Sequence, residues 1–239
     1  MKVLILNSGT GTRMGSLTRN KNKCLATIGA DITIIDWQLK MLFRYGLQDI
    51  CITTGPFAQQ LKDYLYTRYP QVKFVFIHNS QYEKTNYIFS IYLARNYLND
   101  NLLLMHGDLL FDENVLKDVL ASKDSVMTID HTKPLPEKDF KAVVVNGQIR
   151  QVGVEFFTNA YYAQPLYKLN SDDWAIWLNE IIHFCEQGKT NVYAENALNK
   201  VSNEVSLLPL DLKGQHCFEV DTLEDLEVAR AWYMQVKEK

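Results

Sequence analysis

The chain has 239 residues, of which 47% are hydrophobic, and this is enough to bury a sizeable core. Its formal net charge of −3 excludes the broad basic surface that duplex nucleic acid requires, although local lysines and backbone amides can still bind a small anion. No apolar run approaches the ~18 residues of a membrane span, and the four cysteines have no CxxC spacing. We therefore expect a cytoplasmic protein with reduced thiols, no membrane segment and no zinc or disulfide framework.

The first half of the sequence alternates segments of strand and helix character. Apolar runs typical of strands occupy residues 3–6, 49–54, 72–77 and 101–105, and helical periodicity occupies residues 33–45, 59–69 and 88–98. This order predicts parallel strands with helices on both faces of the sheet. We expect an α/β fold, namely a three-layer, doubly wound, Rossmann-like sandwich with a mostly parallel mixed sheet.

The second half has fewer helices. Residues 125–130 and 141–145 have strand character, and the pair Asn146-Gly147 between apolar residues predicts a hairpin. Residues 173–187 and 222–237 predict helices, the second with Thr222 as its N-cap and Asp225 three residues later. Because no linker or repeat interrupts the chain, we expect one domain over residues 1–239.

A glycine-rich turn, NSGTGTRMG, directly follows the first strand. Gly9 and Gly11 allow the backbone to turn tightly and approach phosphate groups, and Arg13 adds a planar, permanently charged donor. The turn lacks the GK[ST] of a Walker A loop and the third glycine of a dinucleotide-binding fingerprint. Taken alone it fits a plain strand-to-helix turn as well as a phosphate site.

Three further motifs follow in order along the chain. Lys23 stands in the segment KCL, the strand LLLMHGD ends in Asp108, and EVDTLEDL places Asp221 just before the last helix. A carboxylate at the carboxyl end of a strand is well placed to hold Mg²⁺ against phosphates. Taken alone, Asp221 is more typical of a residue that stabilises a helix N-terminus, and only its pairing with Asp108 favours a metal site.

Together these motifs resemble the nucleotidyltransferase family, which joins a nucleoside triphosphate to a phosphorylated small molecule and releases pyrophosphate. That family opens with LAAGxGTR and a PKxL-type lysine, whereas this chain has Asn7-Ser8 in place of the two alanines and Asn22 in place of the proline. The first departure bears on contacts with the base, and the second suggests a looser lysine loop. The glycines, Arg13 and Lys23 are retained.

The resemblance implies a role for each retained residue. Arg13 would neutralise the leaving β- and γ-phosphates, Lys23 would contact the α-phosphate and the acceptor phosphate, and Asp108 with Asp221 would bind Mg²⁺. His106 receives no catalytic role. Residues 1–125 would mainly bind the nucleotide, and residues 126–239 would mainly bind the acceptor and supply the closing helix. The nucleotide contacts implied are Leu6, Asn7, Ser8, Gly9, Thr10, Gly11, Thr12, Arg13, Lys23, Asn86 and Gly107.

Residues 83–95 resemble the TNNxxSLxxA segment of the bacterial cytidylyltransferases that use phosphocholine, and this favours CTP. Asn86 fits either a contact with the base or ribose, or the N-cap of the following helix. For the acceptor we expect contacts from Tyr161, Tyr193, Glu195 and Asn196. An aromatic box that also includes Tyr162, Trp174 and Trp177 is the alternative to core packing, which helical spacing favours for the two tryptophans.

The resulting hypothesis is a Mg²⁺-dependent transfer of CMP to a small phosphorylated amine or amide, such as phosphocholine or glutamine phosphate. Its product would be a CDP-activated intermediate for decorating surface polysaccharide. Its partners would be small molecules, without nucleic acid or membrane. A sugar-1-phosphate nucleotidyltransferase is the alternative within the family. A GT-A-type glycosyltransferase lacks support because the first acid of its DxD motif is missing here. An inactive nucleotide sensor is the alternative outside enzymes.

Overall fold

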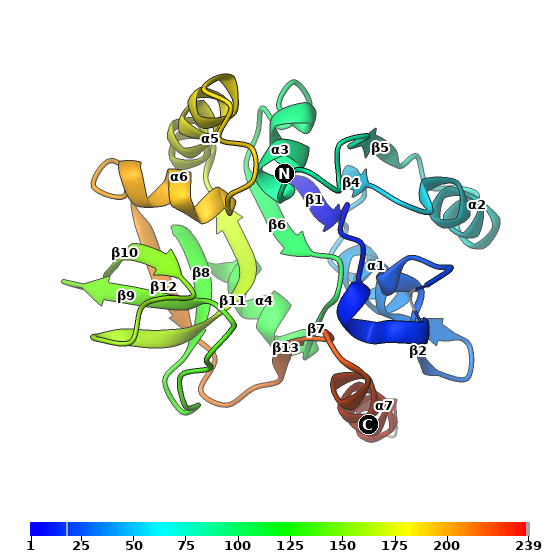
Figure 1. Ribbon diagram of the computed structural model, residues 1–239. Coiled ribbons are helices and arrows are strands. Elements are labelled where there is room, and N and C mark those ends of the chain that lie inside the picture. The colour runs from blue at the N-terminus through cyan, green and yellow to red at the C-terminus, as the bar shows by residue number, and fades with distance from the viewer. Residues whose placement is uncertain (18, 238–239) are drawn as a thin grey trace.

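The computed structural model describes residues 1–17 and 19–237, and a nine-stranded mixed sheet runs through it (Figure 1). Its main path has the order β10-β9-β11-β6-β1-β4-β5, and β8 branches from β11 and pairs with β12. Helices lie on both sides of this sheet. The predicted three-layer α/β architecture is confirmed. In the part of the chain that is described, no helix is long and apolar enough to cross a membrane.

The parallel part of the sheet is built by the first half of the chain. Its strands are β1 (Lys2–Asn7), β4 (Ile50–Thr54), β5 (Val75–His78) and β6 (Leu102–His106). Val3 and Ile5 pack into the core on one face of β1, whereas Leu4 and Leu6 pack into the core on the other face. The continuous apolar run is therefore a strand buried on both sides, as predicted.

The second half joins this sheet through an antiparallel strand. Its strands are β8 (Ser125–Asp130), β9 (Lys141–Val145), β10 (Gln148–Gly153), β11 (Ala160–Leu169) and β12 (Leu207–Asp211). Strand β11 runs antiparallel to β6, β8 and β9. The predicted hairpin is confirmed, because Asn146 and Gly147 both have positive φ between β9 and β10. Strands β11 and β12 were not predicted, since Pro165 and Pro209 interrupt their pattern.

Seven α-helices occur in the described residues, and the sequence predicts five of them. They are α1 (Ile34–Arg44), α2 (Ala58–Arg68), α3 (Tyr87–Ala94), α4 (Glu113–Ala121), α5 (Ser171–Glu186), α6 (Ala194–Val201) and α7 (Leu223–Lys237). Helix α7 begins with the predicted cap, because the Asp225 amide donates to Thr222 Oγ1 and the Thr222 amide donates back to the Asp225 carboxylate. Helices α4 and α6 have only nine and eight residues, which is too short for a clear periodic signal.

Short elements bring distant motifs together at the carboxyl ends of β1 and β6. They are the 3₁₀ helices η1 (Thr12–Leu17) and η2 (Lys23–Leu25) and the strands β2 (Thr27–Gly29), β3 (Ile32–Thr33), β7 (Leu109–Phe111) and β13 (Cys217–Glu219). Strand β13 pairs antiparallel with β7, and the Val220 amide donates to the Asp108 carbonyl at 3.0 Å. This pairing holds the segment around Asp221 beside Asp108, across more than 100 residues of sequence.

Candidate active site

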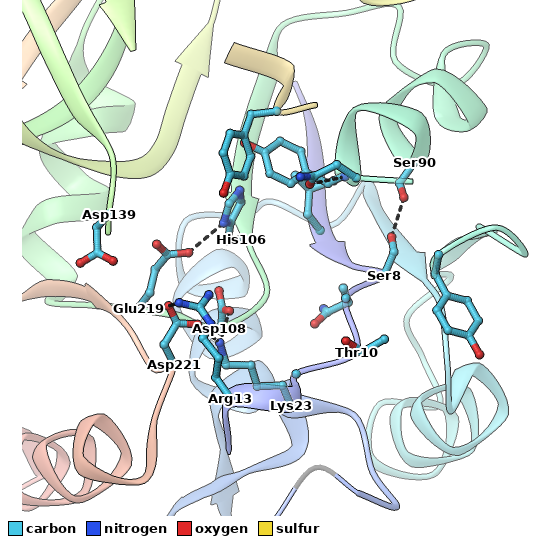
Figure 2. Close-up of a pocket in the computed structure, with 18 of the residues that line it drawn as sticks. Ser8, Thr10, Arg13, Lys23, Ser90, His106, Asp108, Asp139, Glu219 and Asp221 are labelled. Carbon is cyan, nitrogen blue, oxygen red and sulfur yellow. Dashed lines mark hydrogen bonds and ion pairs between the residues drawn. The ribbon is translucent and has the colours of Figure 1, made fainter. Parts of the chain in front are cut away.

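A cavity of about 710 Å³ opens at the carboxyl ends of β1 and β6, where ligands bind in open α/β sheets. Its size suits a ligand of nucleotide size. Residues from both halves of the chain line it, including the glycine-rich turn, Lys23, Asp108, Asp139, Tyr193 and Asp221. Figure 2 shows the charged side chains gathered on one side of this cavity, with Ser8 and Thr10 on the strand-to-turn segment beside them.

The glycine-rich turn forms one wall of the cavity. Gly9, Thr10 and Gly11 all line it, and Gly11 has a φ of 63°, which favours glycine. A Cβ built on Gly9 would meet nothing within 4 Å, so this stretch of backbone faces open space that a ligand can approach. Arg13 extends from the turn with a side chain that is 64% exposed. The side chain of Thr12 lies outside the described part of the structure.

Asn7 and Ser8, which replace the two alanines of the family motif, have different surroundings. Ser8 Oγ lies 2.9 Å from Thr53 Oγ1 and 2.7 Å from Ser90 Oγ, so its hydroxyl belongs to a buried polar cluster. The amide of Asn7 packs so closely on Gly107 that a Cβ at that position would overlap it. Asn7 Nδ2 is buried and has no hydrogen-bond partner among the described residues, so a ligand acceptor would satisfy it.

Lys23 connects the two acidic motifs. Its Nζ donates to Asp108 Oδ2 at 2.5 Å and also to Asp221 Oδ1. Burial lowers the pKa of this ammonium, but the two carboxylates outweigh burial, so the pKa is raised and Lys23 stays charged. The charge of Lys23 in turn holds the pKa of Asp108 below its usual range, although burial acts in the opposite direction. The ammonium thus holds together two carboxylates that would otherwise repel each other.

The surroundings of the two carboxylates fit a divalent cation. Asp108 Oδ1 is buried without a hydrogen-bond partner among the described residues, and Arg13 lies 2.8 Å from Asp221 Oδ2. Carboxylate oxygens are the ligands that Mg²⁺ prefers, and an unsatisfied buried oxygen is costly unless something binds it. Figure 2 shows Asp108 and Asp221 turned toward Lys23 and Arg13.

The lysine loop is anchored although it lacks the family's proline. Asn22 is buried, and its side-chain oxygen accepts from the Cys24 amide at 3.1 Å. Its Nδ2 donates to the Asn7 carbonyl at 3.3 Å. The amide side chain of Asn22 therefore both caps η2 and ties the loop to the end of β1.

His106 and Glu219 form a second polar pair in the cavity wall. His106 Nδ1 lies 2.8 Å from Glu219 Oε1. Burial lowers the pKa of His106, but the hydrogen bond and the negative charge of Glu219 dominate and raise it to about 9. One oxygen or nitrogen from each of His106, Asp108 and Glu219 lies within 4.8 Å of the others. The histidine is thus a hydrogen-bonded neighbour of the acidic residues, as its strand-end position suggested.

The predicted acceptor residues lie in different environments. Tyr193 lines the cavity, and its ring lies 5.1 Å from Phe140 and 5.8 Å from Tyr87. Glu195 is only 1% exposed and does not reach the cavity. Its carboxylate accepts instead from the hydroxyls of Tyr87 and Tyr167, the latter at 2.8 Å. Glu195 therefore supports Tyr87 from behind the cavity wall.

The remaining aromatic and amide candidates also differ in whether they line the cavity. Neither Tyr161 nor Asn196 lines the cavity. Trp174 and Trp177 are almost fully buried and pack at 5.7 Å in the core, which confirms the prediction from helical spacing. Asn86 caps α3, because its Oδ1 accepts from the Tyr87 amide, and it also lines the cavity, so a contact with the nucleotide stays a prediction.

Several cavity residues were not predicted as ligand contacts. Glu219 stands two residues before Asp221, so the alternation of a strand could have revealed that both face the same side. Asp139 lines the cavity with a pKa raised by burial and by the charge of Asp221. Phe140 follows it, and no motif in the sequence marks either residue. All four cysteines are buried and unpaired.

Comparisons with known proteins agree with this arrangement. A family model described as nucleotidyl transferase matches residues 2–153, a range that contains the glycine-rich turn, Lys23 and Asp108. The CTP:phosphoglutamine cytidylyltransferase of Campylobacter jejuni is 25% identical, over 95% of this chain and 98% of that protein. The choline-phosphate cytidylyltransferase of Streptococcus pneumoniae is 27% identical, over 94% of this chain and 95% of that protein.

Solved structures with similar folds include members that use different nucleotides. The CTP:phosphocholine cytidylyltransferase from Streptococcus pneumoniae superposes with a TM-score of 0.76 and 19% identity, covering 97% of this chain and 98% of that one. A putative glucose-1-phosphate thymidylyltransferase from Bacillus anthracis gives 0.78 and 18%, covering 97% and 94%. At these identities the likeness establishes the fold and leaves the substrate open.

Proposed function

The chain belongs to the nucleotidyl transferase family, and we propose that it transfers CMP from CTP to the phosphate of a small phosphorylated amine or amide, with release of pyrophosphate. The observation that carries the proposal is the convergence of Arg13, Lys23, Asp108 and Asp221 at one cavity. Around a glycine-rich turn, the two cations can contact the phosphates of a nucleoside triphosphate and the two carboxylates can bind its metal ion. The CDP-activated product would serve the decoration of surface polysaccharide, as the sequence resemblance implies.

The chemistry requires mainly positioning and charge neutralisation. An oxygen of the acceptor phosphate attacks the α-phosphorus of CTP, and the bond from that phosphorus to the bridging oxygen of pyrophosphate breaks. The nucleophile is already an anion, so no general base is needed. Arg13, which is largely exposed at the mouth of the turn, neutralises the departing β- and γ-phosphates.

Lys23 neutralises the α-phosphate and the acceptor phosphate as they approach each other. In the free protein its ammonium is held by Asp108 and Asp221. Binding of nucleotide and metal would give these carboxylates another cation, and the ammonium would exchange them for phosphate oxygens. The side chain of Lys23 lines the cavity in which the phosphates would bind.

Mg²⁺ is the metal that fits this site. Asp108 and Asp221 would hold it, since Asp108 Oδ1 is buried without a partner among the described residues and both groups are hard oxygen ligands. When bound, the ion would supply positive charge to the α-phosphate and orient it for in-line attack. The Asp108 carboxylate, with a pKa below its usual range, is ready to bind a cation near neutral pH.

Two of the relatives named above support CTP and acceptors of the amine or amide type, because their names specify such substrates. The aromatic pair Phe140 and Tyr193 and the carboxylate of Glu219 offer a surface for such an acceptor. A sugar 1-phosphate is the alternative acceptor within the family. An inactive nucleotide sensor would bind the nucleotide in the same cavity but would not catalyse its transfer.

The test is pyrophosphate release in a matrix of substrates. CTP, UTP, dTTP, ATP and GTP would each be combined with phosphocholine, phosphoethanolamine, glutamine phosphate and sugar 1-phosphates, with Mg²⁺ present or removed by chelation. The proposal predicts release with CTP and an amine or amide phosphate, lost on chelation and restored by Mg²⁺. Release only with a sugar 1-phosphate contradicts the proposed acceptor, and CTP binding without release under any combination supports the sensor.

A further inference from the structure

A second cluster of metal-binding groups lies outside the catalytic cavity. Asp130 ends β8, His131 follows it directly, and Asp211 ends β12. The two strands pair in parallel, so their carboxyl ends meet at the same edge of the sheet (Figure 1). One possible ligand atom from each of the three residues lies within 4.8 Å of the other two. None of the three lines the catalytic cavity.

Asp130 is the buried member of this cluster and has an unused ligand atom. It is only 2% exposed, and its Oδ1 accepts hydrogen bonds from the amide and hydroxyl of Thr132, at 2.9 and 2.7 Å. Its Oδ2 is equally buried but has no hydrogen-bond partner among the described residues. An ionised carboxylate oxygen in this state is costly unless a cation or donor binds it.

Asp211 is also held through one oxygen, but its other oxygen is paired with His131. Its Oδ1 accepts from the backbone amides of His131 and Lys213, at 3.3 and 3.2 Å. Its Oδ2 lies 2.6 Å from His131 Nδ1. In each carboxylate, therefore, hydrogen-bond donors of the neighbouring loops hold one oxygen. The second oxygen of Asp130 has no partner among the described residues, and the second oxygen of Asp211 is placed beside the His131 imidazole. Hydrogen bonds of this kind commonly orient the ligands of metal sites.

We propose that Asp130, His131 and Asp211 form a second metal site, which binds one divalent cation of the Zn²⁺ or Mn²⁺ type. An imidazole with two carboxylates suits these ions better than Mg²⁺, which prefers oxygen ligands and retained water. Solvent can supply a further ligand, since His131 is 52% exposed on its side chain. The argument for this site does not rest on the proposed transfer reaction.

The position of the site would give a bound ion a structural effect on the cavity. The loop after β8 leads to Asp139 and Phe140, and the turn after β12 leads through β13 to Glu219 and Asp221. An ion held by Asp130, His131 and Asp211 would connect the bases of these two segments. It would thereby fix the distance between two segments that both contribute residues to the cavity.

The experiment compares the wild-type chain with two variants, in each of which one histidine is replaced. Zn²⁺ bound per chain would be measured by isothermal titration and by metal analysis after dialysis, for the wild type, His131→Ala and His183→Ala. His183 is an exposed histidine of α5, and its imidazole contacts the side chain of Gln187. It is therefore the matched control. All three proteins keep the same acidic groups in the catalytic cavity, so any difference counts only the second site.

We expect His183→Ala to bind the same number of Zn²⁺ ions as the wild type. His131→Ala should bind one ion fewer, or should bind one of the ions at least ten times more weakly than the wild type does. In isotopically labelled protein, the imidazole resonance of His131 is identified as the one that is missing in His131→Ala. In the wild type, this resonance should shift when Zn²⁺ is added. It should not shift in Asp211→Asn, which keeps the fold because Asp211 is partly exposed. Equal Zn²⁺ binding by all three proteins, or an unperturbed His131 resonance, would overturn the proposal.

Discussion

The cavity has two walls that are built in different ways. The nucleotide-side wall consists of the glycine-rich turn, Arg13 and Lys23, and all of it comes from the first 23 residues. The acceptor-side wall consists of Phe140, Tyr193 and Glu219, which come from three segments far apart in sequence. The first wall therefore depends on local backbone conformation, and the second depends on the packing of the whole sheet. This difference teaches that, in the proposed function, a short motif would be enough to form the phosphate-binding wall, whereas the acceptor-binding wall would require the complete fold.

The largest effect is expected where the two walls meet. Asp108→Asn keeps the shape of the side chain but removes the negative charge that holds Lys23 and, in our account, Mg²⁺. We expect turnover to fall by roughly 10³-fold or more, with the far-ultraviolet circular dichroism unchanged. Asp118→Asn, an exposed aspartate of α4, is the control. A folded Asp108→Asn protein with normal turnover would contradict the metal-binding role that we assign to the motifs of Asp108 and Asp221.

A smaller loss is expected from the nucleotide-side wall alone. Arg13→Ala removes one charged donor to the leaving phosphates, and we expect kcat/KM for CTP to fall about 100-fold. Stability should not change, because the Arg13 side chain is 64% exposed. Arg19→Ala, an exposed arginine that does not line the cavity, should behave like the wild type. Equal kinetics for the two variants would remove Arg13 from the proposed machinery.

The His106–Glu219 pair predicts a pH dependence of stability. Because the pKa of His106 is raised to about 9, its stabilising contribution is complete below its ordinary value near 6.5 and is lost as pH rises through 9. We expect the free energy of unfolding to fall by on the order of 2 kcal/mol over this window, as measured by urea denaturation.

The matched variants for this measurement are His106→Gln and His183→Gln. The first should flatten the pH dependence, because it removes the titrating group, and the second should keep it. A decline of the same size in His106→Gln and the wild type would show that another group is responsible.

The smallest effect is expected from the acceptor-side wall. Tyr193→Ala removes an aromatic contact worth roughly 1–1.5 kcal/mol, so we expect KM for the acceptor to rise about tenfold while KM for CTP is unchanged. Tyr161→Ala is a close control, because Tyr161 is similarly exposed but does not line the cavity. If KM for CTP rose instead, the division into two walls would be wrong.

The comparison also explains what the sequence could predict. The parallel half of the fold was predictable, because strands such as β1 and β6 are continuous apolar runs followed by characteristic motifs. Lys23, Asp108 and Asp221 were identified individually by motif, and the structure brings their charged groups into direct contact. What the sequence lacked was the pairing of β13 with β7 that produces this contact.

The acceptor-side wall was harder to predict for a physical reason. Glu195 carries the same chemistry as Glu219, but it lies on a buried helix face and bonds to two tyrosine hydroxyls. Tyr161 and Tyr193 are both half-exposed tyrosines, and only the position of their elements determines which one faces the cavity. Residue type alone cannot distinguish such pairs, because burial and direction depend on long-range packing.

The most direct test of the central claim is to follow the oxygen atoms of the acceptor. Phosphocholine, phosphoethanolamine and glutamine phosphate, each labelled with ¹⁸O in its phosphate, would be incubated separately with CTP and Mg²⁺, and the products would be analysed by ³¹P NMR and mass spectrometry. Our account predicts a CDP-linked product that retains all of the label, including the bridging oxygen, and pyrophosphate that contains none. Labelled pyrophosphate, or unlinked CMP with pyrophosphate, would contradict attack by the acceptor phosphate on the α-phosphorus.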